Sequence, residues 1–430
     1  MSFADRVLDW LRYAWFELSG LSPVELLLTF WPCFFVDAPW YTLSDVAVWV
    51  RSLFPRRVFL DFERRLALDP PLVTVVVPAH DEAATAEATL DSLLANDYPN
   101  MEIICVDDGS DDGTHAVMKR VAAREPRVRV MRQYPRGGKS SALNRALTVA
   151  RGEILVVTDA DTTFERTAIR EIVRPFGNPR VGAVSGDLRV LNRDDSFCTR
   201  LQACEYLQGI TIGRQWLSMI GFLAICSGAF SAFRRELIRD VGGWDVGPGE
   251  DSDVTLRVRK LGFDAVFEPR AVALTKVPRT FSKLFRQRIR WNRNYIRRLR
   301  KHGNVFRLGL FDLFTFGSYT IGFLYKVVLL ATTIAYLAYL ALNWDSIAPM
   351  VLLFVLSFYG LANFLSLFFA CVLSLHRRED MSLLKYFPFL KPYHVYLKYN
   401  RAVAYLTEIL KLDRPDPYVP LTVWREIPRW

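Results

Sequence analysis

An uncharged apolar stretch toward the C-terminal end constrains the fold more than any other feature of this chain. Residues Ile347–Leu375 contain no Asp, Glu, Lys or Arg. A helix of about 20 apolar residues crosses a ~30 Å hydrocarbon core, so this stretch is long enough to span a membrane. A second uncharged stretch, Val327–Asn343, precedes it, and the short acidic segment 344–346 joins the two. The pattern predicts a transmembrane hairpin within residues 309–380.

Basic residues indicate the orientation of this hairpin. Arg377 and Arg378 follow it, and the segment Arg279–Lys301, within residues 279–308, is strongly basic. Lys and Arg gather on the cytoplasmic side of membranes, where anionic lipids attract them. We therefore interpret the net charge of +10 as binding to membrane lipids and expect no nucleic acid partner. The expected location is the inner or plasma membrane, multi-pass, with the soluble part of the chain in the cytoplasm. The six cysteines have no CxxC spacing, which fits a reducing compartment.

The two ends of the chain also favour a membrane, although less clearly. Apolar stretches at Leu26–Val36 and Ala47–Phe54 are separated by a segment that contains Asp37, Pro39 and Asp45. They predict two short spans within residues 1–60, or one span and an interfacial helix. The segment 381–430 mixes Tyr, Phe, Lys and Pro, which is more typical of interfacial helices than of a further span.

The middle of the chain, residues 61–278, has the alternating pattern of a soluble α/β enzyme. β-Branched runs predict buried strands at Leu72–Val77, Ile103–Val106 and Ile154–Val157, with helices between them at Ala83–Leu94 and Ser141–Ala150. Strands that alternate with helices form parallel sheets with right-handed crossovers. Ligands bind at the carboxyl ends of such strands, so we expect a site where acidic segments follow the strands.

Two acidic turns follow predicted strands. In the first, Val106–Thr114, Asp107 or Asp108 is placed to accept hydrogen bonds from a nucleotide, although an ordinary Asx turn explains the same residues. In the second, Asp159 and Asp161 are two residues apart, a spacing that can hold a divalent cation and through it a diphosphate. A solvated or helix-capping loop is the alternative.

A glycine-rich segment, RGGKSSALN at Arg136–Asn144, lies between these turns. A phosphate loop needs a glycine five residues before Gly138, and Gln133 occupies that position. The segment also does not follow an obvious strand, so a nucleotide hydrolase is a poor fit. Lys139, near a helix start, remains a candidate for a phosphate contact.

Two further segments carry candidate chemistry. Glu250, Asp251 and Asp253 open a predicted helix within Gly247–Phe263, where acids stabilise the helix dipole or one of them acts as a general base. The basic segment contains QRIRW, Gln287–Trp291. Its Trp is suited to stack on a sugar ring and its second Arg to neutralise a departing diphosphate, but an amphipathic interfacial helix would carry the same residues.

The order of these segments is more specific than any one of them. VVVPAHDE, DDGS, GGKSSALN, DAD, GED and QRIRW follow one another between Val73 and Trp291. This set resembles the inverting glycosyltransferases of family 2, and among them the membrane synthases of cellulose, hyaluronan, chitin oligosaccharides and poly-N-acetylglucosamine. The resemblance implies an α/β fold of the GT-A type, a nucleotide-sugar-binding domain inserted between transmembrane and interfacial helices.

The resemblance also implies roles for individual residues. Donor contacts would come from Pro78, His80, Glu82, Asp107, Asp108, Lys139 and Asp159. Asp161, assisted by Asp159, would hold Mg²⁺ or Mn²⁺. Asp251 would be the base, with Glu250 beside it, and Gln287, Arg290 and Trp291 would close over donor and acceptor. The chain departs from the family pattern at His80, which either contacts the nucleotide or packs, and at Gly249, where many synthases have Thr and where we expect glycine to be tolerated.

The implied reaction is one in-line displacement at the anomeric carbon, with inversion. We expect transfer from a UDP-sugar, UDP-N-acetylglucosamine in preference to UDP-glucose, to a growing polysaccharide that is exported across the membrane. An accessory membrane subunit or a second copy of the chain would complete the exit route. The alternatives are transfer of one sugar to a membrane lipid and a catalytically silent subunit that binds the nucleotide-sugar.

Overall fold

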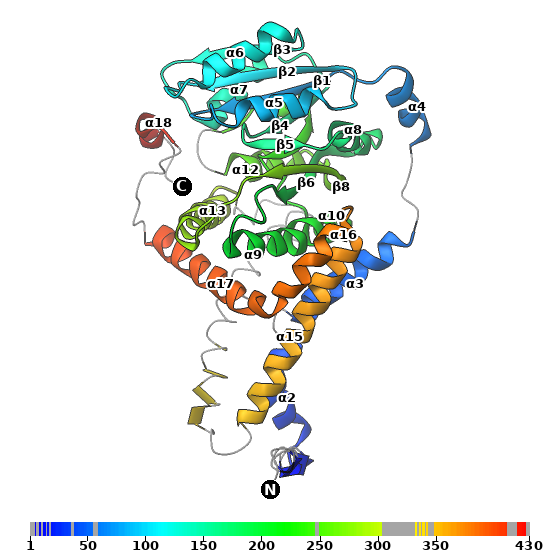
Figure 1. The fold of residues 1–430 in the computed structure, drawn as a ribbon, viewed down its shortest axis with the longest axis vertical. Helices are drawn as coiled ribbons and strands as arrows, with labels where there is room; N and C mark the ends of the chain where they lie inside the picture. The colour runs from blue at the N-terminus through cyan, green and yellow to red at the C-terminus, as the bar shows by residue number, and fades with distance from the viewer. Residues whose placement is uncertain are drawn as a thin grey trace.

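Eight strands form one sheet in the middle of the chain (Figure 1). They are β1 Val73–Ala79, β2 Met101–Asp108, β3 Val128–Gln133, β4 Ile154–Thr158, β5 Thr162–Phe164, β6 Val181–Val190, β7 Phe230–Arg234 and β8 Asp264–Thr275. Their order is β3-β2-β1-β4-β7-β6-β8-β5. The first four strands in this order are parallel to one another, whereas β7 runs antiparallel to both β4 and β6. The sheet is therefore mixed rather than wholly parallel.

In the computed structural model, the described residues are 19–35, 38–54, 59–245, 249–302, 348–410 and 419–426, with isolated residues within 5–16 and 332–342. Most of the first predicted span of the hairpin, Val327–Asn343, lies outside the described residues, and so does the whole acidic segment 344–346.

Helices cover both faces of the sheet, and β1 shows why. Val75 and Val77 belong to one hydrophobic cluster and Val76 to the other, because successive side chains of a strand point to opposite faces. Burial on both faces explains the continuous β-branched run. The first face is covered by α5 Ala86–Leu94, α6 Thr114–Arg124 and α8 Ala168–Val173, and the second by α7 Lys139–Val149, α11 Arg235–Asp240 and α12 Glu250–Lys260.

The three strands predicted from apolar runs are confirmed as β1, β2 and β4, and the two predicted helices as α5 and α7. A strand that was not predicted, β3, precedes the glycine-rich segment and ends at Gln133. Its sequence, VRVMRQ, pairs with β2 but leaves Arg129 and Arg132 exposed, so it lacks the continuous apolar run of a central strand. The strands that precede the two acidic turns, β2 and β4, are not direct neighbours, since β1 lies between them.

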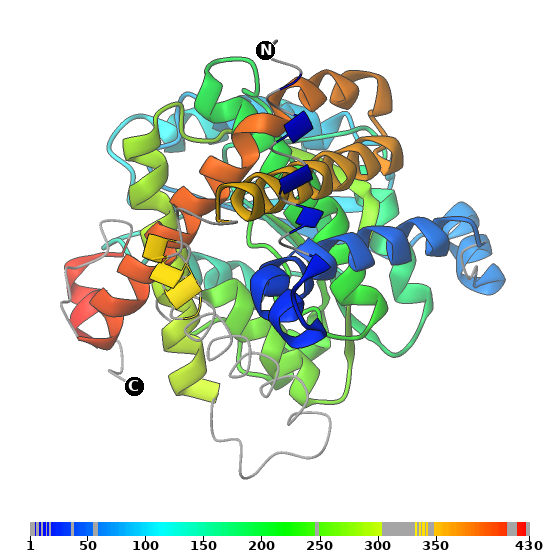
Figure 2. The same cartoon turned by 90° about the horizontal axis from the view of Figure 1, so that it is seen from below.

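A second group of helices lies below the sheet in Figure 1. It comprises α2 Pro23–Phe35, α3 Ala38–Ser52, α9 Phe197–Tyr206, α10 Gly213–Met219, α13 Phe281–His302, α15 Ala348–Leu373, α16 Arg377–Asp380 and α17 Phe387–Ile409. Helix α4 Leu60–Leu68 lies instead beside the upper strands, at the right of Figure 1. A π-helix, Leu207–Ile212, joins α9 to α10, and short 3₁₀ helices lie at Arg174–Gly177 and Met381–Tyr386. The last helix, α18 Leu421–Glu426, contacts α13, where Arg297 Cζ lies 4.8 Å from the centre of the Trp424 ring. Figure 2 shows α15 from below, beside α3. Among the described residues one helix, Val351–Leu373 within α15, is long and apolar enough to cross a membrane.

A buried ion cluster joins α15 to the sheet. Arg189 of β6 donates to Asp380 at 2.5 Å and to Ser374 at 2.7 Å, and its Nε donates to Asp187 at 3.1 Å. Thr211 of the π-helix donates to the other oxygen of Asp187 at 2.8 Å. A buried cation without partners is costly, so separating Asp380 and Ser374 from Arg189 would be unfavourable. The cluster therefore holds the end of the apolar helix against the α/β domain.

The five cysteines whose side chains the structure describes lie among buried apolar residues. Cys105, Cys198, Cys204, Cys226 and Cys371 are free and buried.

Candidate active site

The carboxyl ends of β1, β2 and β4 meet the first turns of α7 and α12, and most of the predicted site residues lie there. The turn after β1 is tied to the turn after β2 by backbone donors. Asp81 donates to Ser110 Oγ at 3.0 Å and Glu82 to Thr114 Oγ1 at 2.8 Å. His80 Nδ1 lies 3.0 Å from the carbonyl oxygen of Asp108, so its ring joins the same two turns. Pro78 is buried within β1.

Asp107 and Asp108 are buried and already engaged. Asp108 Oδ1 accepts from Gly137 N at 2.7 Å and from the Gln133 amide, and its Oδ2 accepts from Gly138 N at 2.8 Å. Asp107 accepts from Ser110 N at 3.0 Å and also pairs with Arg132. The two carboxylates therefore fix the turn after β2 and the loop before α7.

Lys139 contacts residues from several of the loops that form the site. It begins α7, its Nζ pairs with Asp159, and it donates to the carbonyl oxygen of Gly228 at 3.1 Å. Glu250 Oε1 is 3.7 Å away from the same Nζ. Burial opposes the charge on Lys139, but the two carboxylates outweigh it and raise its pKa. The ammonium is thus held in its charged form where three loops converge.

Two further acidic side chains, Glu82 and Asp161, lie close enough to Asp159 for its charge to act on them. Burial, followed by the charges of Asp159 and Glu82, raises the pKa of Asp161 to about 7. Burial also raises the pKa of Glu82, with Asp159 contributing. A hard divalent cation would relieve this repulsion, and Mg²⁺ is commonly held by one or two carboxylates plus substrate phosphates. The donor set fits such an ion, although no three His, Cys, Asp or Glu side chains form a preformed cage among the described residues.

The first turn of α12 presents the predicted base. Asp251 Oδ1 accepts from Ser252 N at 2.7 Å, whereas Oδ2 lies 3.4 Å from Gly228 N. Oδ2 is therefore the less engaged oxygen and faces the point where Lys139 and Glu250 meet. Burial raises the pKa of Glu250, against the opposing effect of Lys139.

Gly249 caps α12 in a left-handed conformation, with φ +91°. A Cβ at this position would lie 3.2 Å from Asn294 Cβ of α13. The glycine thus lets the helix that carries QRIRW approach the helix that carries the base.

Asp253 has a structural role that differs from the roles of Glu250 and Asp251 on the same helix. It pairs with Arg257 at 2.9 Å, with Lys301 at 2.7 Å and with His302 at 2.7 Å. Burial opposes its charge, but these hydrogen bonds outweigh burial and lower the pKa of Asp253. It anchors α12 to the end of α13 and explains why only part of the acidic segment is available for chemistry.

QRIRW lies entirely on α13, as a helix in the basic segment should. Trp291 is 43% exposed, and Gln287 Oε1 and Asn294 Oδ1 are buried without a hydrogen-bond partner. Gln287, Trp291 and Asn294 are four and three residues apart, so they share one face of the helix. Unsatisfied buried acceptors cost free energy, and a sugar hydroxyl would relieve that cost.

Two parts of the site could not be found from the sequence. Gly228 has no distinguishing motif, yet it lies against Lys139, Glu250 and Asp251. Arg214 lies in the first turn of α10 and donates to Ser185 Oγ at 3.1 Å. Burial lowers the pKa of Arg214, and the nearby Asp251 opposes this effect.

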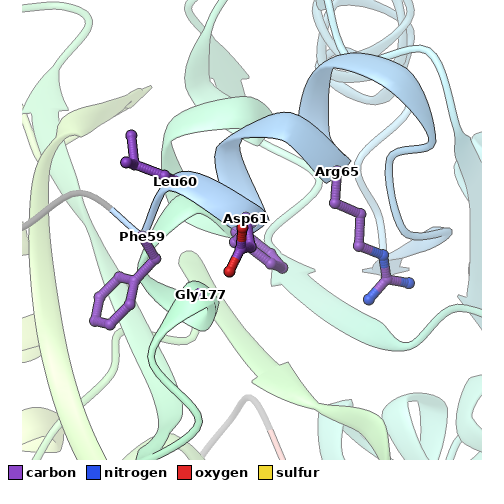
Figure 3. Close-up of a pocket in the computed structure, with 6 residues that line it drawn as sticks. Phe59, Leu60, Asp61, Arg65 and Gly177 are labelled. Atoms are coloured by element: carbon purple, nitrogen blue, oxygen red, sulfur yellow. The ribbon is translucent and has the colours of Figure 1, made fainter.

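A shallow groove elsewhere on the molecule is unrelated to these residues. It encloses about 520 Å³ and is lined by Phe59, Leu60, Asp61, Phe62, Arg65 and Gly177 (Figure 3). None of the predicted site residues lines it.

The comparison with protein families decides the class. The family described as "Glycosyltransferase like family 2" matches residues 70–294, which contain the strand ends, both acidic turns and QRIRW. The chain belongs to this family. It is a glycosyltransferase enzyme.

Relatives of known sequence agree with this class. The chain is 32% identical over 306 residues to a probable glycosyltransferase, YdaM, of Bacillus subtilis, covering 64% of this chain and 72% of that protein. It is 32% identical over 221 residues to the poly-beta-1,6-N-acetyl-D-glucosamine synthase of Staphylococcus epidermidis, covering 51% of this chain. The match spans 53% of that synthase, so about half the length of this relative is shared.

A solved structure agrees with the fold. The mannosyltransferase PcManGT of Pyrobaculum calidifontis, in complex with GDP-Man and Mn²⁺, superposes with a TM-score of 0.54 at 23% identity, covering 87% of this chain and 99% of that chain. The α/β domain is of the GT-A type, as predicted, with a mixed sheet.

Proposed function

We propose that this glycosyltransferase extends a polysaccharide from a UDP-sugar, N-acetylglucosamine in preference to glucose, and exports the product. The convergence of Lys139, Asp159, Glu250 and Asp251 on the backbone of Gly228 carries the proposal, because it places a cation for a diphosphate beside a carboxylate for an acceptor. The identity with a poly-N-acetylglucosamine synthase over the catalytic region supports the polymer and the choice of sugar.

The donor lies along the strand ends in this proposal. Uridine rests on the turns that His80, Asp107 and Asp108 hold together, and the diphosphate meets Lys139 at the start of α7, where free helix N–H groups also favour an anion. Asp161, Asp159 and Glu82 are the residues that would hold Mg²⁺ or Mn²⁺. When bound, the metal supplies positive charge to the leaving diphosphate.

The acceptor approaches from the side of α12 and α13. Asp251 Oδ2 takes the proton of the acceptor hydroxyl as that oxygen attacks the anomeric carbon, and the bond to the diphosphate breaks on the opposite side, with inversion. The ion pair between Glu250 and Lys139 keeps the positively charged lysine nitrogen at the leaving group. Gln287 and Trp291 bind the acceptor sugar, and Arg290 neutralises the diphosphate as it leaves.

The proposed organisation is a cytoplasmic catalytic domain at 61–278 between membrane regions. Residues 1–60, the hairpin 309–380 and the interfacial segments 279–308 and 381–430 would carry the chain on the inner or plasma membrane. The apolar surface of α15 supports this arrangement, because Leu353, Phe354 and Leu356 are all more than half exposed. Such a surface is unfavourable in water. An accessory membrane subunit or a second copy would complete an exit path.

The test is product size. Purified full-length protein in detergent is incubated with Mg²⁺ or Mn²⁺ and each labelled UDP-sugar, and the products are separated on a gel and by partition into organic solvent. We expect high-mass material from UDP-N-acetylglucosamine. A single small, lipid-soluble product would replace this proposal by glycolipid synthesis, and polymer from another donor alone would refute the assigned sugar.

A further inference from the structure

Arg288, one of the two residues between Gln287 and Arg290, is the least exposed arginine of this motif. It is 5% exposed, and its Nη2 donates to Glu205 Oε2 of α9 at 3.0 Å. The hydroxyl of Tyr393, from α17, donates to the same carboxylate oxygen at 2.5 Å. One oxygen thus fixes both an arginine and a tyrosine, and three helices meet at it.

The guanidinium of Arg288 covers one face of Trp291. Its Cζ lies 4.2 Å from the centre of the indole ring, within the range of a cation–π contact. The two residues are three positions apart on α13 and so are neighbours on its surface. Since the ring is 43% exposed, part of it remains accessible while the arginine holds the buried side.

The charge of Arg288 is stabilised despite its burial. Burial disfavours the charged form of the guanidinium, but the charge of Glu205 outweighs this effect and raises the pKa of Arg288. A planar guanidinium fixed by a carboxylate has a defined orientation, and a ring stacked on it is held parallel to the same surface. Without Glu205 the arginine would have several rotamers, and the indole would lose the surface beneath it.

We propose that Arg288 is a positioning residue that holds Trp291 in the orientation needed to bind the acceptor sugar, with Glu205 and Tyr393 holding Arg288. The proposal rests on the function proposed above in taking Trp291 as the acceptor platform. It adds that the platform is set from α17, the helix that packs along α13 and donates through Tyr393.

A direct readout of the ring tests this without any turnover. Protein labelled with 5-fluorotryptophan is examined by ¹⁹F NMR, and the Trp291 resonance is assigned by its loss in Trp291→Phe. We expect this resonance to shift and broaden in Arg288→Met, Glu205→Gln and Tyr393→Phe. The control is Glu408→Gln, which removes charge from a carboxylate that pairs α17 with Arg293 and Arg297 of α13 and should leave the resonance unchanged. An unchanged resonance in Arg288→Met, or an equal change in Glu408→Gln, would overturn the proposal.

Kinetics then distinguish positioning from stability alone. With oligosaccharides of N-acetylglucosamine as acceptors, Glu205→Gln and Tyr393→Phe should raise the acceptor KM roughly 3- to 30-fold, the range that a cation–π contact represents. The donor KM should stay within about twofold of the wild type. An unchanged acceptor KM in a variant whose resonance has moved would show that the orientation of Trp291 does not matter for the acceptor. If the wild type uses no such acceptor, the NMR result still decides whether Arg288 orients the ring, and the proposed function alone fails. Tyr393→Phe removes only a hydroxyl, so it keeps the test open if Arg288→Met does not fold.

Discussion

Gly228→Ala should damage catalysis while leaving the fold intact. The residue has no positive φ, so alanine is compatible with its backbone. The added Cβ would lie 2.9 Å from Lys139 Nζ and 3.3 Å from Glu250 Oε1, whereas ordinary contacts begin at 3.4 Å. The lysine nitrogen is the end of a flexible side chain, so the methyl group displaces it by about half an ångström instead of disrupting the core. A misplacement of ~1 Å in an active site can cost about a hundredfold in rate.

We therefore expect kcat/KM for the donor to fall roughly tenfold in Gly228→Ala, and the free energy of unfolding to change by less than about 1 kcal/mol, or ~3 °C in Tm. The assay is release of nucleoside diphosphate at varied donor concentration, with a thermal melt of the same preparation. The matched control is Gly209→Ala in the π-helix, where a Cβ would meet nothing within 4 Å and wild-type kinetics are expected. Wild-type kcat/KM in Gly228→Ala would refute the placement of Lys139 and Glu250 around this glycine.

Three further predictions concern stability. In Gly249→Ala, the left-handed φ and the contact with Asn294 should lower the free energy of unfolding by about 1–2 kcal/mol, measured by chemical denaturation. Between its ordinary pKa of 3.8 and about 7, folded Asp161 keeps a proton that the unfolded chain loses. Metal-free protein should thus lose stability as pH rises through this window. Thermal melts with a chelator should show a smaller dependence in Asp161→Asn, where the raised pKa values of Glu82 and Glu250 still contribute. Asp380→Ala leaves Arg189 buried with one carboxylate fewer and should cost about 3 kcal/mol; a melting temperature equal to the wild type would contradict the role of this cluster.

Much of the α/β domain could be predicted because its central strands have simple patterns. β1, β2 and β4 are buried on both faces, so they appear as continuous β-branched runs. β3 could not be recognised, since it lies at the sheet edge and alternates apolar residues with exposed arginines. The antiparallel strands β6 and β7 depend on pairing between residues far apart in the chain, for which a single sequence holds no local signal.

Site residues that belong to a sequence motif could be predicted, whereas residues that matter only through their position in the fold could not. Asp159, Lys139 and Asp251 could be named from the sequence, and the structure brings them together. Without the family resemblance, the residues alone did not separate Asp251 from Asp253, because both are acids in one helical turn. Their difference comes from the partners that α13 supplies. Likewise, nothing local to Gly228 or Glu205 marks them, since each matters through residues distant in the chain.

The central claim, that Asp251 is the base and not merely a helix-capping acid, is tested most directly by comparing Asp251→Asn with Asp253→Asn. Both variants are assayed for sugar transfer, for binding of the nucleotide-sugar and for melting temperature. We expect Asp251→Asn to lose activity by roughly a hundredfold to ten-thousandfold, with donor binding and melting temperature close to the wild type. Asp253→Asn should melt at a lower temperature yet retain transfer, because it loses its charged contacts with Arg257, Lys301 and His302. Substantial transfer by Asp251→Asn would contradict the account.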